Sequence, residues 1–159
     1  MPTAPASLSI VVPMYNESAG MDAFFFRVNA VLNDITPDWE IICVNDGSRD
    51  GTLMRLKDWH RREPRIKLLS LSRNFGKEAA LTAGLHHAFG RAVIPIDADL
   101  QDPPELIPEM VRKWQDGYKV VLATRRTRRG ESLFKRGTAW LFYKLMGRVA
   151  STAIPPNTG

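Results

Sequence analysis

The sequence predicts an α/β fold with a mostly parallel sheet, because strand-like and helix-like stretches alternate along its 159 residues. The stretches between the expected strands carry apolar residues at the 3.6-residue spacing of helices. Such a sheet has helices on both faces, and its ligands bind at the carboxyl ends of the strands. Strands are expected at Leu8–Val12, Glu40–Val44, Ile66–Leu71, Ala92–Ile96 and Lys119–Ala123.

The expected helices follow from apolar spacing and from end signals. Pro103 and Pro104 suit the first turn of a helix, where proline is tolerated, and Gly117 suits its C-terminal end. The helices between the strands are expected at Met21–Ile35, Leu53–Trp59, Glu78–Phe89 and from Pro103 to Gly117.

The composition is that of a globular chain, with 44% hydrophobic and 25% charged residues. The single cysteine, Cys43, excludes an internal disulfide framework and fits a reducing compartment. No apolar run approaches the ~18–20 residues of a membrane span. Residues 1–7 lack a basic segment, so a cleaved signal peptide is not expected.

The charge is unevenly distributed along the chain. Residues 1–110 contain 11 lysines and arginines against 15 aspartates and glutamates, a net charge of −4. Residues 111–159 contain 11 basic residues against Asp116 and Glu131, a net charge of +9. The basic end therefore favours an anionic partner, either phosphates, a membrane surface or nucleic acid, over a merely solvated face. Nucleic acid ranks last, because no recognition motif for it is present.

Carboxylates cluster after the fourth expected strand, in Asp97-Ala98-Asp99-Leu100-Gln101-Asp102. Three carboxylates within six residues repel one another unless a cation neutralises them, and oxygen ligands suit Mg²⁺ or Mn²⁺. Asp46, in the turn Asn-Asp-Gly-Ser after the second strand, is expected on the neighbouring rim. Neither G-x-G-x-x-G nor G-x-x-x-x-G-K-[ST] is present, which argues against a dinucleotide-binding enzyme and a P-loop NTPase.

Four ordered motifs carry a specific resemblance. They are Val-Val-Pro-Met-Tyr-Asn-Glu, Val-Asn-Asp-Gly-Ser-Arg-Asp-Gly-Thr, Ser-Arg-Asn-Phe-Gly-Lys-Glu-Ala-Ala-Leu and Asp-Ala-Asp-Leu-Gln-Asp-Pro-Pro-Glu. This series resembles glycosyltransferase family 2, with its nucleotide-sugar-binding GT-A fold. It is most similar to the polyprenyl-phosphate branch, which includes dolichol-phosphate mannosyltransferases and bacterial undecaprenyl-phosphate (bactoprenol) glucosyltransferases.

The resemblance implies a role for individual residues, with Asp46 accepting a hydrogen bond from the base. Asp97, Asp99 and Arg125 would be catalytic, and Asp99 and Gln101 would bind the divalent metal, Mg²⁺ or Mn²⁺. The donor would be bound by Pro13, Tyr15, Glu17, Asp46, Lys77 and Asp97. The acceptor phosphate would be bound by Arg125, Arg128, Arg129, Lys135 and Arg136.

The implied activity is transfer of glucose from UDP-glucose to undecaprenyl phosphate, with inversion at the anomeric carbon. A divalent ion would screen the diphosphate leaving group. The alternatives are GDP-mannose or another UDP-sugar as donor, a family-2 transferase acting on a polysaccharide, and a domain that binds nucleotide sugar without turnover.

The C-terminal part is expected to meet the membrane. Residues 1–131 would form the catalytic core, and residues 132–159 a basic amphipathic helix and tail on the acceptor side. Leu133–Ala150 places Phe134, Leu141 and Leu145 on one face and cations opposite, which suits a helix in an anionic bilayer surface or one packed on the sheet. The expected location is the cytoplasmic face of the inner membrane, as a peripheral protein. The final segment resembles a family motif that normally continues, so truncation is expected.

Overall fold

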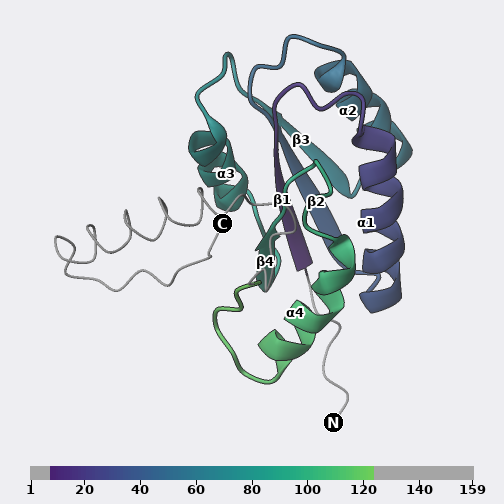
Figure 1. The fold of residues 1–159 in the computed structure, drawn as a ribbon, viewed down its shortest axis with the longest axis vertical. Helices are drawn as coiled ribbons and strands as arrows, with labels where there is room; N and C mark the ends of the chain where they lie inside the picture. Colours follow the sequence, from purple (N-terminus) through teal and green to yellow (C-terminus); the bar gives the residue numbers. More distant parts are fainter. Residues whose placement is uncertain (1–7, 124–159) are drawn as a thin grey trace, which may run out of the picture. The chain divides into compact units, whose positions relative to one another are not determined.

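The computed structural model describes residues 8–123. Its sheet has four parallel strands in the order β3-β2-β1-β4, which confirms the expected parallel α/β architecture (Figure 1). Each strand is rich in apolar, mostly branched residues, as strands covered on both faces are. The strands are β1 (Leu8–Met14), β2 (Trp39–Asn45), β3 (Ile66–Ser70) and β4 (Ala92–Pro95).

A helix follows each strand. The sequence placed these helices correctly but missed some of their ends: α3 ends nine residues after it begins rather than continuing to Phe89, and the segment after Pro103 begins with a 3₁₀ turn before the α-helix. The helices are α1 (Met21–Ile35), α2 (Thr52–Arg62), α3 (Lys77–His86), the 3₁₀ helix η1 (Pro104–Leu106) and α4 (Ile107–Gln115).

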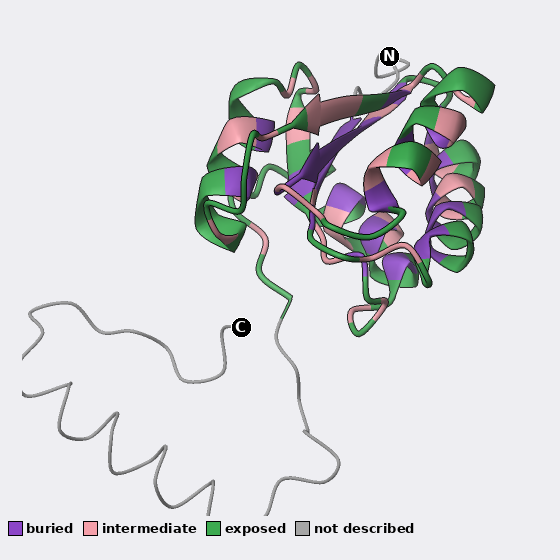
Figure 2. Ribbon diagram, turned by 90° about the horizontal axis from the view of Figure 1, so that it is seen from above, coloured by how far each residue is buried: buried purple, intermediate pink, exposed green. Residues whose placement is uncertain are grey.

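Helices cover both faces of the sheet, as expected. Alternate residues of β1 point to opposite sides: Ile10 and Val12 pack with α1, α2 and α4, whereas Val11 packs with α3. The buried residues in Figure 2 accordingly lie along the strands and the inner faces of the helices. Helix α3 lies unusually close to the sheet, because a Cβ on Gly84 would stand 2.4 Å from Val11 Cγ1.

The expected fifth strand at Lys119–Ala123 is wrong. These residues have no strand conformation and pair with no strand in the part of the chain that the structure describes. Val120 and Leu122 are exposed, at 74% and 63%. A run of strand-forming residues becomes a strand only where a neighbouring strand offers backbone hydrogen bonds and cover for its side chains.

The chain divides after Gly117 into two units, and of the second the structure describes only residues 118–123. The expected boundary between residues 131 and 132, and the expected helix Leu133–Ala150, lie outside the described residues. None of the helices between residues 8 and 123 has the length and apolar character that a membrane span requires.

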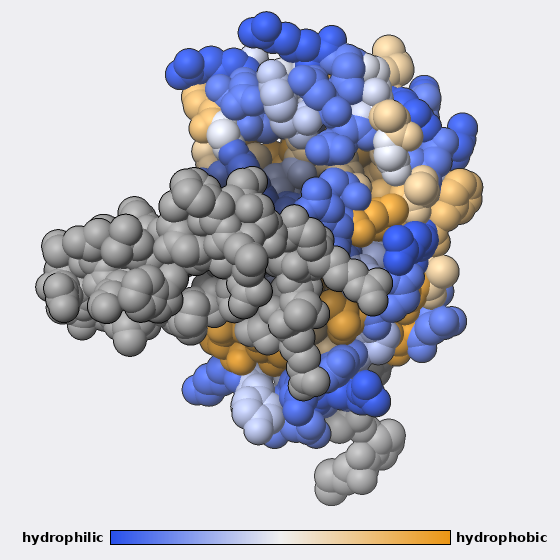
Figure 3. All heavy atoms as spheres, in the orientation of Figure 1, coloured by the Kyte–Doolittle hydropathy of each residue, from blue (hydrophilic) through white to orange (hydrophobic). Residues whose placement is uncertain are grey.

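The parallel arrangement brings the ends of the strands to one side of the sheet. Met14, the last residue of β1, is in register with Asn45, which is the last residue of β2 and pairs with Ser70 of β3. The loops that follow these three strands lie together at the upper end in Figure 1, and hydrophilic side chains dominate that end in Figure 3. This end of the sheet therefore carries the candidate site.

Candidate active site

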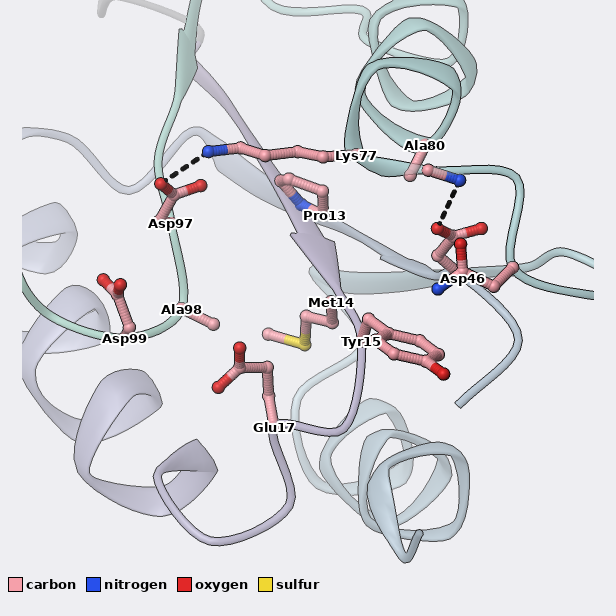
Figure 4. A pocket seen from close by; sticks show the side chains of 12 residues that line it. Pro13, Met14, Tyr15, Glu17, Asp46, Lys77, Ala80, Asp97, Ala98 and Asp99 are labelled. Carbon is pink, nitrogen blue, oxygen red and sulfur yellow. Dashed lines mark hydrogen bonds and ion pairs between the residues drawn. The ribbon is translucent and has the colours of Figure 1, made fainter. Parts of the chain in front are cut away.

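A pocket of about 310 Å³ lies where the carboxyl ends of β1, β2 and β4 meet the start of α3. Its walls come from four of the post-strand segments that the sequence singled out (Figure 4). The lining residues are Pro13, Met14, Tyr15, Glu17, Asp46, Asn74, Gly76, Lys77, Ala80, Asp97, Ala98 and Asp99.

One side of the pocket is acidic. Figure 4 shows Glu17, Asp97 and Asp99 grouped on this side, apart from Tyr15 and Asp46 on the other. Partial burial, and then the negative charges of Asp99, Asp50 and Asp97, raise the pKa of Glu17 above its usual value. The neighbouring carboxylates therefore lie close enough to Glu17 for their charges to disfavour its ionised form, which a bound cation would relieve.

Lys77 is the basic residue that reaches this acidic side. Its Nζ lies 2.7 Å from Oδ2 of Asp97, in an ion pair between the first residue of α3 and the segment after β4. This hydrogen bond with Asp97 raises the pKa of Lys77, so the side chain stays cationic. Both side chains are half-exposed, so water screens the pair and leaves Lys77 able to bind another anion.

Asp46 is buried at the end of β2, with 3% of its surface exposed. Its Oδ1 accepts the backbone N–H of Phe75 at 2.7 Å, and its Oδ2 accepts the N–H of Gly76 at 2.9 Å. The two backbone donors give each oxygen of this buried side chain a hydrogen-bond partner. The carboxylate has about four lone-pair positions, so two remain for a ligand.

Side-chain hydrogen bonds tie the loop after β1 to the loop after β2. The N–H of Asn16 donates to Oγ of Ser48 at 3.0 Å, and the N–H of Glu17 donates to Oγ1 of Thr52 at 2.9 Å. Desolvation opposes ionisation of Asp50, but hydrogen bonds from Thr52 and Ser18 outweigh it and hold its pKa well below the usual range. These contacts fix the position of Glu17 at the edge of the pocket.

The structure brings together seven of the residues expected at the site. Gln101, expected as a metal ligand, is exposed and does not line the pocket, and its N–H donates to Oδ1 of Asp99 at 2.9 Å. Five expected acceptor residues, Arg125, Arg128, Arg129, Lys135 and Arg136, lie outside the described residues. The seven that line the pocket are Pro13, Tyr15, Glu17, Asp46, Lys77, Asp97 and Asp99.

Asn74 and Gly76 also line the pocket, although no individual role was expected for either residue. Their position in a glycine-containing loop between a strand and a helix is the feature of the sequence that could have indicated a role in the pocket. Gly76 has φ 98°, a conformation that a side chain disfavours, and this lets the loop turn its amide toward Asp46.

The acidic side suits a hard divalent cation that shares its coordination with phosphate. Within residues 8–123 no three His, Cys, Asp or Glu side chains form a ready-made metal cage. Mg²⁺ and Mn²⁺ sites often use one or two carboxylates together with substrate phosphate oxygens. Asp99, with Asp97 and Glu17 beside it, provides donors of this type, and the other ligands would come from a diphosphate.

A parallel α/β sheet with a pocket and clustered aspartates at its carboxyl end fits the GT-A fold that the resemblance implied. Sequence comparison specifies the family: residues 9–158 match Glycosyl transferase family 2. The chain belongs to this family, as the resemblance implied.

Two relatives show how closely the chain follows the family. It is 57% identical over 152 residues to an uncharacterized glycosyltransferase of Synechocystis sp., covering 96% of this chain and 48% of that protein. It is 44% identical over 153 residues to the bactoprenol glucosyl transferase of Shigella phage SfV, covering 96% of this chain and 50% of that protein. The chain thus spans about half the length of these relatives.

Solved structures agree on the fold. A mannosyltransferase from Pyrobaculum calidifontis, in complex with GDP-Man and Mn²⁺, matches with a TM-score of 0.65 and 27% identity, covering 78% of this chain and 37% of that chain. Glucosyl-3-phosphoglycerate synthase from Mycobacterium tuberculosis matches with a TM-score of 0.67 at 22% identity, covering 96% of this chain and 55% of that chain.

Proposed function

We propose that this chain is the donor-binding part of a glycosyltransferase that moves a sugar from a nucleotide sugar to a polyprenyl phosphate. The observation that carries the proposal is the pocket with Glu17, Asp97 and Asp99 on one side and the Nζ of Lys77 reaching Asp97 there. Asp99, with Asp97 and Glu17 beside it, would hold a divalent cation, and this cation together with Lys77 would neutralise a diphosphate. A nucleoside diphosphate leaves more easily once its charge is screened.

The nature of the acceptor is supported by the relatives. Several proteins that are 43–44% identical to most of this chain are named bactoprenol glucosyl transferases or their homologue. A lipid phosphate is already anionic at neutral pH, so its oxygen can attack the anomeric carbon without a strong general base. Direct displacement of this kind inverts the configuration at that carbon.

The acceptor phosphate is assigned to the basic segment. Arginine grips phosphate through two hydrogen bonds, which would align the attacking oxygen with the leaving group. Arg125 is proposed to take part in catalysis in this way. The full proposed set is Arg125, Arg128, Arg129, Lys135 and Arg136, all outside the described residues.

UDP-glucose is the favoured donor, with Pro13, Tyr15 and Asp46 on the nucleobase and ribose side of the pocket. A free lone pair of Asp46 can accept the imide N–H of uracil. A second candidate is GDP-mannose, because the mannosyltransferase of similar fold binds GDP-Man with Mn²⁺. Another UDP-sugar, a polysaccharide acceptor and binding without turnover are the remaining alternatives.

The proposed location is the cytoplasmic face of the inner membrane, where a nucleotide sugar and a polyprenyl phosphate can meet. The net charge of +9 on residues 111–159 supports peripheral association with an anionic bilayer surface.

Isothermal titration with UDP, UDP-glucose, GDP and GDP-mannose, each with Mn²⁺, Mg²⁺ or EDTA, tests the donor assignment. We expect UDP and UDP-glucose to bind more tightly than the guanine nucleotides, and only with a divalent ion. Tighter binding of GDP would transfer the assignment to the mannosyl donor. Absence of binding by all four nucleotides would overturn the donor site altogether.

A further inference from the structure

The loop before α3 is attached to the end of β2 through one side chain. Both oxygens of the Asp46 carboxylate accept backbone N–H groups of this loop, from Phe75 at 2.7 Å and Gly76 at 2.9 Å. Asp46 is itself fixed, because its own N–H donates to the carbonyl of Met14 at 2.9 Å. The backbone that carries this carboxylate is therefore held to β1, and the carboxylate makes two hydrogen bonds to the loop.

The loop depends on these bonds for its conformation. Phe75 and Gly76 belong to no strand or helix, so the carboxylate supplies the partners that regular structure would otherwise give. Gly76 adopts φ 98°, and Gly47, next to Asp46, comes so close to the loop that an added Cβ would lie 2.4 Å from the carbonyl carbon of Arg73. The turn that carries Asp46 and the loop before α3 are therefore packed directly against each other.

Lys77 follows this loop directly and is the first residue of α3. The amide that Asp46 binds on Gly76 is therefore one residue away from the lysine whose Nζ reaches Asp97 at 2.7 Å. The connection runs from Asp46, the residue after β2, through the backbone of Gly76, to the cation at the acidic side of the pocket. Figure 4 shows Asp46, Lys77 and Asp97 in this arrangement. Asp46 and Lys77 make no direct side-chain bond to each other among the hydrogen bonds and ion pairs of the described residues.

We propose that Asp46 is a positioning residue that sets Lys77 for the diphosphate of the donor, by holding the backbone of Phe75 and Gly76. The inference rests on the proposed donor site and adds to it a second role for Asp46, distinct from recognition of the base. The diphosphate is the ligand group concerned, because Lys77 is a cation on the side of the pocket where Asp97 and Asp99 would share a divalent ion with phosphate.

The two roles differ in how Asp46 and Lys77 depend on each other. If Asp46 positions Lys77, removing either should weaken binding of the diphosphate, and removing both should add little to removing one. If Asp46 acts only on the base, its effect should be the same with or without Lys77, and uridine should lose as much affinity as UDP.

The test is a double-mutant cycle on the full chain, with Asp46→Asn, Lys77→Ala and the double variant, titrated with UDP and Mn²⁺. An asparagine at this position keeps the size but places an NH₂ group against one of the two backbone donors. We expect each single variant to weaken UDP binding about tenfold, and the double variant to be within about threefold of the weaker single variant. Uridine affinity, measured by NMR titration, should fall clearly less than UDP affinity in Asp46→Asn, because uridine reports only the contact with the base.

The positioning role would be overturned if the double variant lost UDP affinity by the product of the two single losses. It would also be overturned if Asp46→Asn lost uridine and UDP affinity equally. Failure of the parent to bind UDP would instead overturn the proposed donor site, so the two failures are distinguishable. Asp34→Asn and Lys57→Ala, exposed residues on α1 and α2, are matched controls for loss of charge and should leave UDP affinity unchanged.

A second variant covers the case in which Asp46→Asn does not fold. Gly76→Ala strains the loop at φ 98° but leaves the Asp46 carboxylate in place, and a Cβ there meets no atom within 4 Å. It should weaken UDP binding in the parent about threefold or more but have little effect in a Lys77→Ala background. Equal effects in both backgrounds would contradict the proposal.

Discussion

Lys77 Nζ and Asp97 Oδ2 lie 2.7 Å apart and join the start of α3 to the segment after β4. The pair crosses the pocket at the place where the acidic side begins (Figure 4). The charge of Lys77 is therefore available both to neutralise Asp97 and to bind the phosphate group of a ligand. A divalent ion and a diphosphate that enter together would satisfy the aspartate and the lysine separately.

Lys77→Gln should therefore change the binding of metal and nucleotide in opposite directions. Without the cation, the acidic side attracts Mn²⁺ alone more strongly, and because the pair is half-exposed we expect only about a two- to fivefold gain. Binding of UDP with Mn²⁺ should weaken, because the diphosphate loses a cationic partner. Electron paramagnetic resonance of free Mn²⁺ measures the first effect and calorimetry the second. A parallel loss of both affinities would contradict the account.

Asp99→Asn should greatly weaken Mn²⁺-dependent UDP binding while the fold remains intact. Asp99 is exposed at the rim of the pocket and is not part of the hydrophobic core. The far-UV circular dichroism spectrum and the melting temperature of the variant should therefore match those of the parent. We expect a loss of at least about tenfold in affinity, the scale of a lost charge-assisted ligand. Equal Mn²⁺-dependent UDP affinity in variant and parent would remove Asp99 from the metal site, and Asp34→Asn serves as the charge control.

Glu40 forms a polar cluster away from the pocket that should govern acid stability. Burial opposes its ionisation, but its bonds to Lys67 at 2.5 Å, to Ser9 at 2.5 Å and to the N–H of Phe89 at 2.8 Å lower its pKa below the usual 4.5. A carboxyl group with a depressed folded-state pKa stabilises the fold above the unfolded-state value, and the contribution disappears as the pH falls through the folded-state value.

Glu40→Gln should accordingly lower the free energy of unfolding by about 2 kcal/mol at pH 7. The difference between variant and parent should shrink as the pH falls from about 5 toward the depressed pKa of Glu40. Urea denaturation at a series of pH values measures this. The exposed Glu109→Gln on α4 is the control and should leave stability unchanged. A difference that is constant across the series would contradict the ionic role of Glu40.

Gly84→Ala should destabilise the protein, although alanine favours a helix. The higher helix propensity of alanine would by itself stabilise the fold by about 1 kcal/mol. The new methyl group would stand 2.4 Å from Val11 Cγ1 and 3.0 Å from Val44 Cγ2, and overpacking of this kind costs about 1–3 kcal/mol. We expect a lower urea midpoint than in the parent. Gly20→Ala, with open space around it, should be neutral or stabilising, and the same behaviour in both variants would contradict the close packing of α3.

The chain should bind anionic membranes through its basic end. Phosphatidylglycerol vesicles are expected to co-sediment the protein, and binding should weaken without vanishing as salt rises from about 0.05 to 0.5 M, because screening removes only the electrostatic part. Replacing Leu141 and Leu145 with serine should remove the salt-resistant part. If the two serine substitutions lower the melting temperature and leave vesicle binding unaltered, the face that carries Leu141 and Leu145 packs on protein. No binding at low salt would contradict peripheral association.

The alternation of strand-like and helix-like stretches was sufficient to predict the parallel sheet and the order of its elements. Strands such as Ile41–Val44 are buried on both faces, so their composition signals their position directly. The error at Lys119–Ala123 has the opposite cause: its residues favour a strand, but strand formation depends on a neighbour that the local sequence does not reveal.

The site was predictable as far as the strand ends determine it. Glu17, Asp46, Asp97 and Asp99 could be assigned to one pocket because carboxyl ends of parallel strands share an edge. The bonds of Asp46 could not be predicted, because they join residues 29 and 30 positions apart and depend on the backbone conformation of Gly76. The sequence predicted which residues meet, but not how each is held.

We expect the pocket at the carboxyl end of the sheet to bind a divalent ion together with a nucleoside diphosphate. Paramagnetic broadening of backbone amide signals by Mn²⁺, with and without UDP, tests it most directly because it locates the ion. With UDP present, we predict the strongest broadening at Ala98, Asp99 and Gly76, which line the pocket, and much weaker broadening at Glu40 and Phe89 on the polar cluster. Strongest broadening anywhere outside the pocket, or none that depends on UDP, would contradict the claim.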